Sequence, residues 1–95
     1  MRFPVLVLIL KNNIYQLAKG DPECIQCNRE LVPLADLLPD SLTDLSLRER
    51  GKVLATVEAM ERELEVLLRD RKITETKAVF LLHEAQLVQD SVGRS

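Results

Sequence analysis

The chain has 95 residues, of which 46% are hydrophobic and 29% charged, and its formal net charge at pH 7 is -2. This composition is typical of a small globular domain and argues against disorder. The near-neutral charge gives no overall attraction to nucleic acid or to an anionic membrane. Aromatic residues make up only 3%, so the core must be aliphatic. We therefore treat residues 1–95 as a single small domain.

The first ten residues, MRFPVLVLIL, resemble the beginning of a signal peptide. The apolar run is short, however, contains Pro4, and is followed by Lys11 rather than by the small residues of a cleavage site. It is also too short to span a bilayer. We therefore expect no cleaved leader, no membrane partner, and a cytoplasmic location in which both cysteines are reduced.

The N-terminal segment, residues 1–20, admits two predictions. In residues 5–10, β-branched residues alternate with leucines, so both faces of a strand would be apolar, as in a strand that is covered on both sides. Asn12 and Asn13 tolerate the left-handed backbone of a two-residue hairpin turn. We predict an apolar β-hairpin in which residues 14–18 form the returning strand. The alternative is a single helix from residue 5 to residue 19.

A proline-rich connector follows, over residues 21–45. Pro33 and Pro39 bracket one short helical turn or two, because proline suits a first helical turn and disfavours helix in the residue before it. The same turn contains an LxxLL pattern formed by Leu34, Leu37 and Leu38. Such a pattern presents an apolar helix edge to a partner's groove. We therefore regard these three leucines as a candidate docking turn.

Residues 46–95 predict two antiparallel helices joined by a short break. Ser46 and Glu49 form a capping box at the start of the first helix, and Thr74 is a candidate cap for the second. Gly51 is costly if the first helix has already begun before it, so a later helix start or a close backbone approach would explain it. Apolar residues recur at spacings of three and four. They are Val53, Val57, Met60, Leu64 and Leu67 in the first helix and Ala78, Leu81, Ala85, Val88 and Val92 in the second.

Cys24 and Cys27 are spaced as in a metal-binding knuckle or a redox pair. The stretch CIQCNREL resembles half of a zinc knuckle, with Asn28 in place of the usual glycine. Zinc needs four ligands, and the remaining two are missing from one chain. Two chains could complete a four-thiolate site, in a spacing similar to that of the zinc hook of coiled-coil repair ATPases. The simpler interpretation is that both cysteines pack as small apolar residues under a turn.

Other polar candidates are weaker. His83 is the only histidine, and no nucleophile or second ligand is placed beside it by spacing. The basic groups Arg48, Arg50, Lys52 and Arg69, Arg71, Lys72 are interleaved with acidic residues and lack aromatic neighbours. We therefore interpret them as solvated helix surface rather than as a nucleic-acid site. No catalytic constellation is present, and we predict that the protein is not an enzyme.

These elements predict a mostly helical α+β fold. An N-terminal β-hairpin or strand precedes a C-terminal antiparallel helix hairpin, and dimerisation completes the small core. The expected function is that of a non-enzymatic protein–protein interaction module: a homodimeric adaptor, chaperone-like subunit or small regulator. The residues expected to carry assembly are Val53, Val57, Met60, Leu64, Leu67, Leu81, Ala85 and Val88. The alternatives are a zinc-bridged dimer through Cys24 and Cys27 and a small nucleic-acid-binding regulator.

Overall fold

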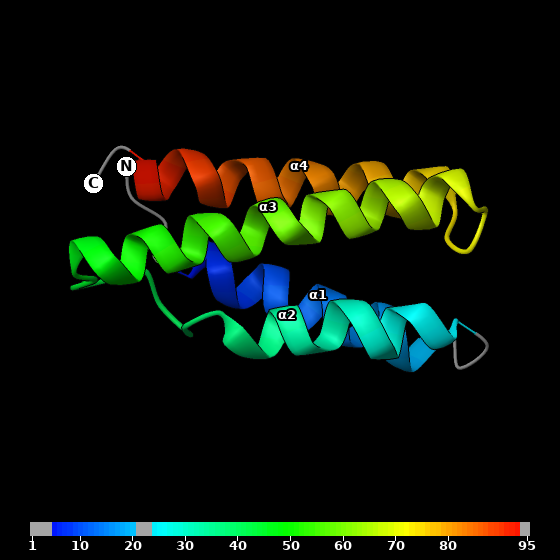
Figure 1. The fold of residues 1–95 in the computed structure, drawn as a ribbon, viewed down its shortest axis with the longest axis horizontal. Coiled ribbons are helices and arrows are strands. Elements are labelled where there is room, and N and C mark those ends of the chain that lie inside the picture. The colour runs from blue at the N-terminus through cyan, green and yellow to red at the C-terminus, as the bar shows by residue number, and fades with distance from the viewer. Residues whose placement is uncertain (1–4, 21–23, 94–95) are drawn as a thin grey trace.

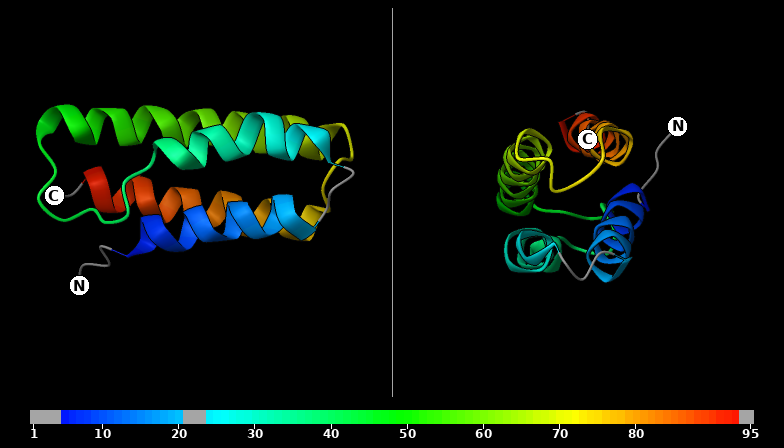
Figure 2. Two further views of the ribbon diagram at one scale, coloured as in Figure 1. Left: turned by 90° about the horizontal axis from the view of Figure 1, so that it is seen from below. Right: turned by 90° about the vertical axis from the view of Figure 1, so that its right-hand side faces the viewer.

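The computed structural model describes residues 5–20 and 24–93, and every regular element in these ranges is helical. The elements in chain order are α1 (Leu6–Gly20), the π-helical turn η1 (Cys27–Leu31), α2 (Val32–Leu37), α3 (Leu47–Arg69) and α4 (Glu75–Gly93). They run alternately in opposite directions, and α4 returns beside α1 (Figure 1; Figure 2). Seen end-on, the helices occupy the corners of a square (Figure 2). The architecture is an up-down-up-down four-helix bundle.

The predicted N-terminal β-hairpin is wrong, and so is the α+β fold class. Asn12 and Asn13 lie inside α1 instead of in a turn. The rival prediction of one helix is close to the observed bounds. Each β-branched residue lowers helix propensity by less than about 1 kcal/mol, so the burial of a whole apolar stripe against α2 and α4 decides the conformation. That stripe, at helical spacing, consists of Val7, Leu10, Ile14, Leu17 and Ala18.

The short turn predicted between Pro33 and Pro39 belongs to a longer helical stretch, residues 25–37. Proline lacks an N–H, and its ring collides with the carbonyl four residues earlier in an α-helix. Just before Pro33, η1 adopts π geometry, and the Val32 N–H donates to the carbonyl of Cys27, five residues earlier. We attribute the passage of the helix through Pro33 to this wider turn. α2 then ends at Leu37, ahead of Pro39.

Polar side chains connect α1 to the segment around α2. The Tyr15 hydroxyl donates to Asp36 Oδ1 over 2.5 Å, and this hydrogen bond is the main reason that the pKa of Tyr15 is raised to about 12. Lys11 Nζ donates to the Leu38 carbonyl over 2.9 Å and pairs with Asp40 Oδ1 at 3.0 Å. These contacts fix the connection between α2 and α3 against α1.

The C-terminal helix hairpin is as predicted, including its caps. The Ser46 hydroxyl accepts the Glu49 N–H and the Glu49 carboxylate accepts the Ser46 N–H, both over 3.1 Å. At the start of α4, the Thr74 hydroxyl accepts the Lys77 N–H over 3.2 Å. These side chains satisfy amide groups that have no partner within the first turn of a helix. The sequence signals for both helix starts are therefore confirmed.

Two backbone hydrogen bonds form the turn between α3 and α4. The Arg71 N–H donates to the Leu68 carbonyl over 3.1 Å, and the Lys72 N–H donates to the Leu67 carbonyl over 2.8 Å. This pair of bonds is a Schellman motif, and Arg71 takes its left-handed position with φ of 58°. Ile73 follows and is buried. The turn therefore reverses the chain within five residues, 70–74, and sets α4 against α3.

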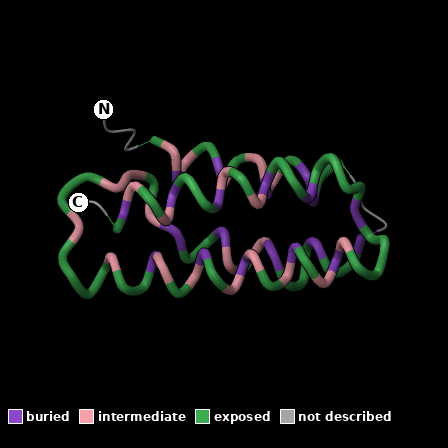
Figure 3. Tube along the Cα trace, turned by 90° about the horizontal axis from the view of Figure 1, so that it is seen from above, coloured by how far each residue is buried: buried purple, intermediate pink, exposed green. Residues whose placement is uncertain are grey.

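The buried residues of all the helices belong to one common core, and Figure 3 marks their positions along the chain trace. Among the described residues, every buried side chain is apolar. The expectation of dimerisation rested on the small core of a two-helix hairpin standing alone. In the structure, α1 and the helical stretch of residues 25–37 cover that hairpin within one chain. Core size therefore no longer requires a second copy.

Gly51 lies inside α3, which begins four residues earlier at Leu47. A Cβ atom added there would meet nothing within 4 Å. Neither a later helix start nor a close backbone approach therefore accounts for the glycine, and nothing in the structure explains it.

Candidate functional site

The outer side of the α1 and α4 pair carries exposed apolar side chains. The Asn13 amide donates to both carboxylate oxygens of Glu84, over 2.8 and 2.9 Å, and this contact fixes the register of the two antiparallel helices. Exposed apolar residues follow at one-turn steps on either side of that contact. They are Val5 (51% exposed), directly before α1, Ile9 (44%) on α1, and Phe80 (55%) and Leu87 (37%) on α4. We call these four residues the α1–α4 surface.

A shallow hollow of about 210 Å³ lies beside Phe80 in this surface. Its apolar walls come from Leu17, Phe80 and Leu81, and its polar edge from Asn13, Gln16 and Lys77. The hollow has the dimensions of an aliphatic side chain or two rather than of a substrate cleft. The α1–α4 surface therefore has projecting apolar side chains and, beside Phe80, a hollow into which an apolar side chain of another chain fits.

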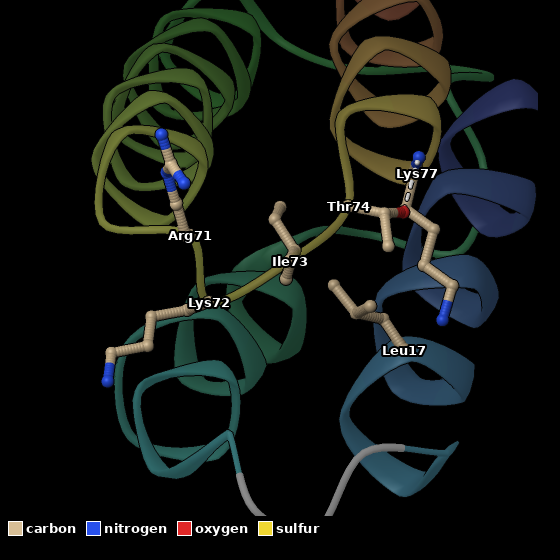
Figure 4. A pocket seen from close by; sticks show the side chains of 6 residues that line it. All are labelled: Leu17, Arg71, Lys72, Ile73, Thr74 and Lys77. Atoms are coloured by element: carbon tan, nitrogen blue, oxygen red, sulfur yellow. Dashed lines mark hydrogen bonds between the residues drawn. The ribbon is translucent and has the colours of Figure 1, made fainter.

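A second hollow, of about 290 Å³, lies at the turn between α3 and α4 (Figure 4). Leu17 and Ile73 form its apolar centre, and three cationic side chains are on its edge. In Figure 4 the side chains of Arg71 and Lys72 extend away from that of Lys77. The structure therefore does not bring the three cations together around this hollow.

The eight residues expected to carry assembly are all buried within one chain, with exposed fractions of at most 4%. Val53, Val57, Met60, Leu64 and Leu67 on α3 face Leu81, Ala85 and Val88 on α4 and the helices of the N-terminal half. Their place in the structure is therefore the bundle core. Another chain could reach them only if the bundle opened.

The candidate docking turn is split between core and solvent. Leu38 is only 3% exposed and belongs to the core, and Leu34 packs against that core from its edge. Leu37 alone projects, with 70% of its surface exposed. The three leucines thus do not form one exposed apolar edge.

Cys24 and Cys27 are joined by a disulfide bond, with their Cα atoms 5.3 Å apart. This differs from the expected reduced thiols. Zinc binds thiolates, so this pair would have to be reduced before it could bind a metal. Within the described residues, no group of three or more His, Cys, Asp or Glu side chains is placed to hold a metal ion.

The remaining polar candidates lie on the surface. His83 is exposed on α4, as are Arg48 and Lys52 near the start of α3. Arg69 pairs with the adjacent Asp70, with 3.6 Å between Nε and Oδ1. His83 lies one turn from both Phe80 and Leu87 on α4, at the edge of the α1–α4 surface.

Comparison of the chain with models of protein families, with curated proteins and with solved structures finds no match. None of the helices in the described ranges has the length and apolar character that crossing a membrane requires.

Sequence reasoning missed the α1–α4 surface because the N-terminal residues were assigned to strands. The signal is nevertheless present. On a helix, Val5 and Ile9 are four residues apart and lie on the side opposite the buried stripe of α1. The interval of seven between Phe80 and Leu87 likewise places both on one side of α4. The helical alternative for residues 5–19, followed through, would have revealed the first pair, and the second pair lies on a helix that the sequence analysis already predicted.

Proposed function

We propose that the protein is a non-enzymatic interaction module, a small homodimeric adaptor, chaperone-like subunit or regulator, and that a second copy binds at the α1–α4 surface. The observation that carries the proposal is the grouping of Val5, Ile9, Phe80 and Leu87 along one side of two adjacent helices. Apolar side chains gathered in this way are typical of a surface that another protein covers.

A second copy is favoured because the surface is complementary to itself. Phe80 and its hollow lie on one side of the Asn13–Glu84 contact, and Val5, Ile9 and Leu87 lie on the other. A two-fold axis near that contact and perpendicular to the two helices would place Phe80 of each copy against Ile9 and Leu87 of the other. Self-complementarity of this kind is the defining property of a two-fold dimer interface.

The test is the mass of the full chain in solution, measured by sedimentation velocity over a range of concentrations. The wild-type chain, of 10.8 kDa, should sediment as a dimer, and Phe80→Glu should sediment as a monomer with an unchanged helical circular dichroism spectrum. Val79→Glu is the matched control, since Val79 is also 55% exposed on α4 but lies outside the α1–α4 surface. A monomeric wild-type chain, or equal loss of the dimer in both variants, would contradict the proposal.

Two alternatives predict other results. A zinc-bridged dimer through Cys24 and Cys27 predicts that only the reduced chain dimerises, with one zinc per two chains in native mass spectrometry. A nucleic-acid-binding regulator that uses the helix around Arg48 and Lys52 predicts salt-dependent retardation of DNA or RNA in a mobility assay. Phe80→Glu should leave both of these activities unchanged, so the three proposals are distinguishable.

A further inference from the structure

The Cys24–Cys27 disulfide lies in the first turn of the helical stretch of residues 25–37. Residues three apart share one side of a helix, so the spacing brings the two sulfur atoms together. The Cys27 N–H donates to Cys24 Sγ over 3.3 Å. Cys24 therefore occupies the position of a helix-capping residue, and its sulfur accepts an amide that would otherwise have no partner in the first turn.

Both cysteines are also part of the core, with 3% of Cys24 and none of Cys27 exposed. Cys27 is the first residue of η1 and shares the core with Leu31 at the other end of that turn. Next to Cys27, the Asn28 amide donates to the carbonyl of Ala18 near the end of α1, over 3.4 Å. The disulfide thus connects the helix start, the π-helical turn and the contact with α1.

We propose that the Cys24–Cys27 pair is a reversible redox site and that its oxidation state controls the order of η1. A dithiol reductant supplies two electrons and two protons. One of its thiolates attacks Cys24 Sγ, because Cys24 keeps 3% of its surface exposed and Cys27 none. The S–S bond breaks, and Cys27 leaves as a thiolate and takes up a proton. The second thiol of the reductant then attacks the mixed disulfide and releases Cys24, while the reductant becomes a cyclic disulfide.

Three features of the structure explain why reduction of the disulfide should make η1 less ordered. Two separate thiols need more room than two bonded sulfur atoms, and Cys27 has no exposed surface into which its side chain can move. The adjoining π-helical turn is the least regular part of the helical stretch. Reduction also frees Cys24 to leave the Cys27 N–H. The amides of η1 should therefore open more often, whereas α3 and α4 have their own caps and packing.

Hydrogen exchange of the full chain tests this inference, with one sample oxidised by oxidised glutathione and the other reduced by dithiothreitol. Alkylation and mass spectrometry count the thiols in each sample. Amides of residues 28–32 should exchange about tenfold or more faster in the reduced chain, and amides in the middle of α3 should be unchanged. The Cys24→Ser/Cys27→Ser chain is the control, and its exchange should not respond to dithiothreitol.

Two free thiols after treatment with oxidised glutathione would overturn the inference, and so would equal exchange rates in both forms. The wild-type chain alone gives this answer even if the double variant fails to fold. The inference is independent of the α1–α4 surface, because exchange at η1 can be measured whether the chain is a monomer or a dimer.

Discussion

The two halves of the bundle are built differently. α3 and α4 are 23 and 19 residues long, begin at side-chain caps and meet through a short regular turn. The N-terminal half consists of α1, with 15 residues, and a helical stretch that contains a π-helical turn, an internal proline and a disulfide. In the C-terminal half, local signals and tertiary packing favour the same structure. In the N-terminal half, packing against the other helices decides the outcome.

Removing one core leucine from each half should change stability most and tests whether the two halves fold together. Leu10 in α1 and Leu64 in α3 are both fully buried, so Leu10→Ala and Leu64→Ala should each lower the free energy of unfolding by about 2–5 kcal/mol. If the halves form one cooperative unit, each variant unfolds in urea in a single transition, followed by circular dichroism. An early, partial transition in Leu10→Ala alone would mean that the α3–α4 hairpin stands without α1.

Replacing either of two helical glycines by alanine should change the free energy of unfolding less. Gly51 lies within α3 and Gly20 ends α1, and neither has a neighbour that an added Cβ would meet. Gly51→Ala should raise the free energy of unfolding by about 0.5–1 kcal/mol, because alanine restricts the unfolded chain and favours helix. Gly20→Ala should raise the free energy of unfolding by less, since glycine is favoured at helix ends. Thermal unfolding of both variants and the wild type measures these stability changes. Equal increases in stability for Gly51→Ala and Gly20→Ala would contradict the prediction.

The smallest expected effect is a pH dependence specific to the start of α3. The Ser46 backbone N–H, and then its side chain, lower the pKa of Glu49 from its ordinary value of 4.5. The ionised carboxylate is thus stabilised in the folded state, so its contribution is present above pH 4.5 and is lost as the pH falls through the lowered value. The stability difference between wild type and Glu49→Gln should therefore shrink on acidification in this range. A difference that does not change with pH would contradict this assignment.

The sequence was sufficient to predict the C-terminal hairpin, down to the side chains of its caps and its core stripes. Ser46, Glu49 and Thr74 are local signals whose partners are three residues away, so no knowledge of the rest of the fold is needed. The spacing of Val53, Val57 and Met60 indicates a helix with one buried side. Here the local pattern was sufficient for the helix starts and the buried stripes, although not for the left-handed turn at Arg71.

The N-terminal half could not be predicted in the same way. Residues 5–10 are apolar at every position, so their pattern fits a covered strand and a helix equally well. The choice depends on α2 and α4, which are distant in sequence. The α1–α4 surface shares this dependence, because its two parts belong to opposite ends of the chain. For the cysteine pair, spacing alone was compatible with thiols, a metal or a bond.

The wholly apolar core described above has a consequence for the order of the helices around the bundle. Within the described residues, no buried polar group distinguishes one arrangement of four apolar stripes from its mirror arrangement. Loop lengths and the shapes of the core layers can select one arrangement, and so can polar contacts at the rim. Asn13–Glu84 joins α1 to α4, Tyr15–Asp36 joins α1 to α2, and Gln89–Glu61 joins α4 to α3. These rim contacts are specific to the observed order of the helices, so they add to its preference over the mirror arrangement.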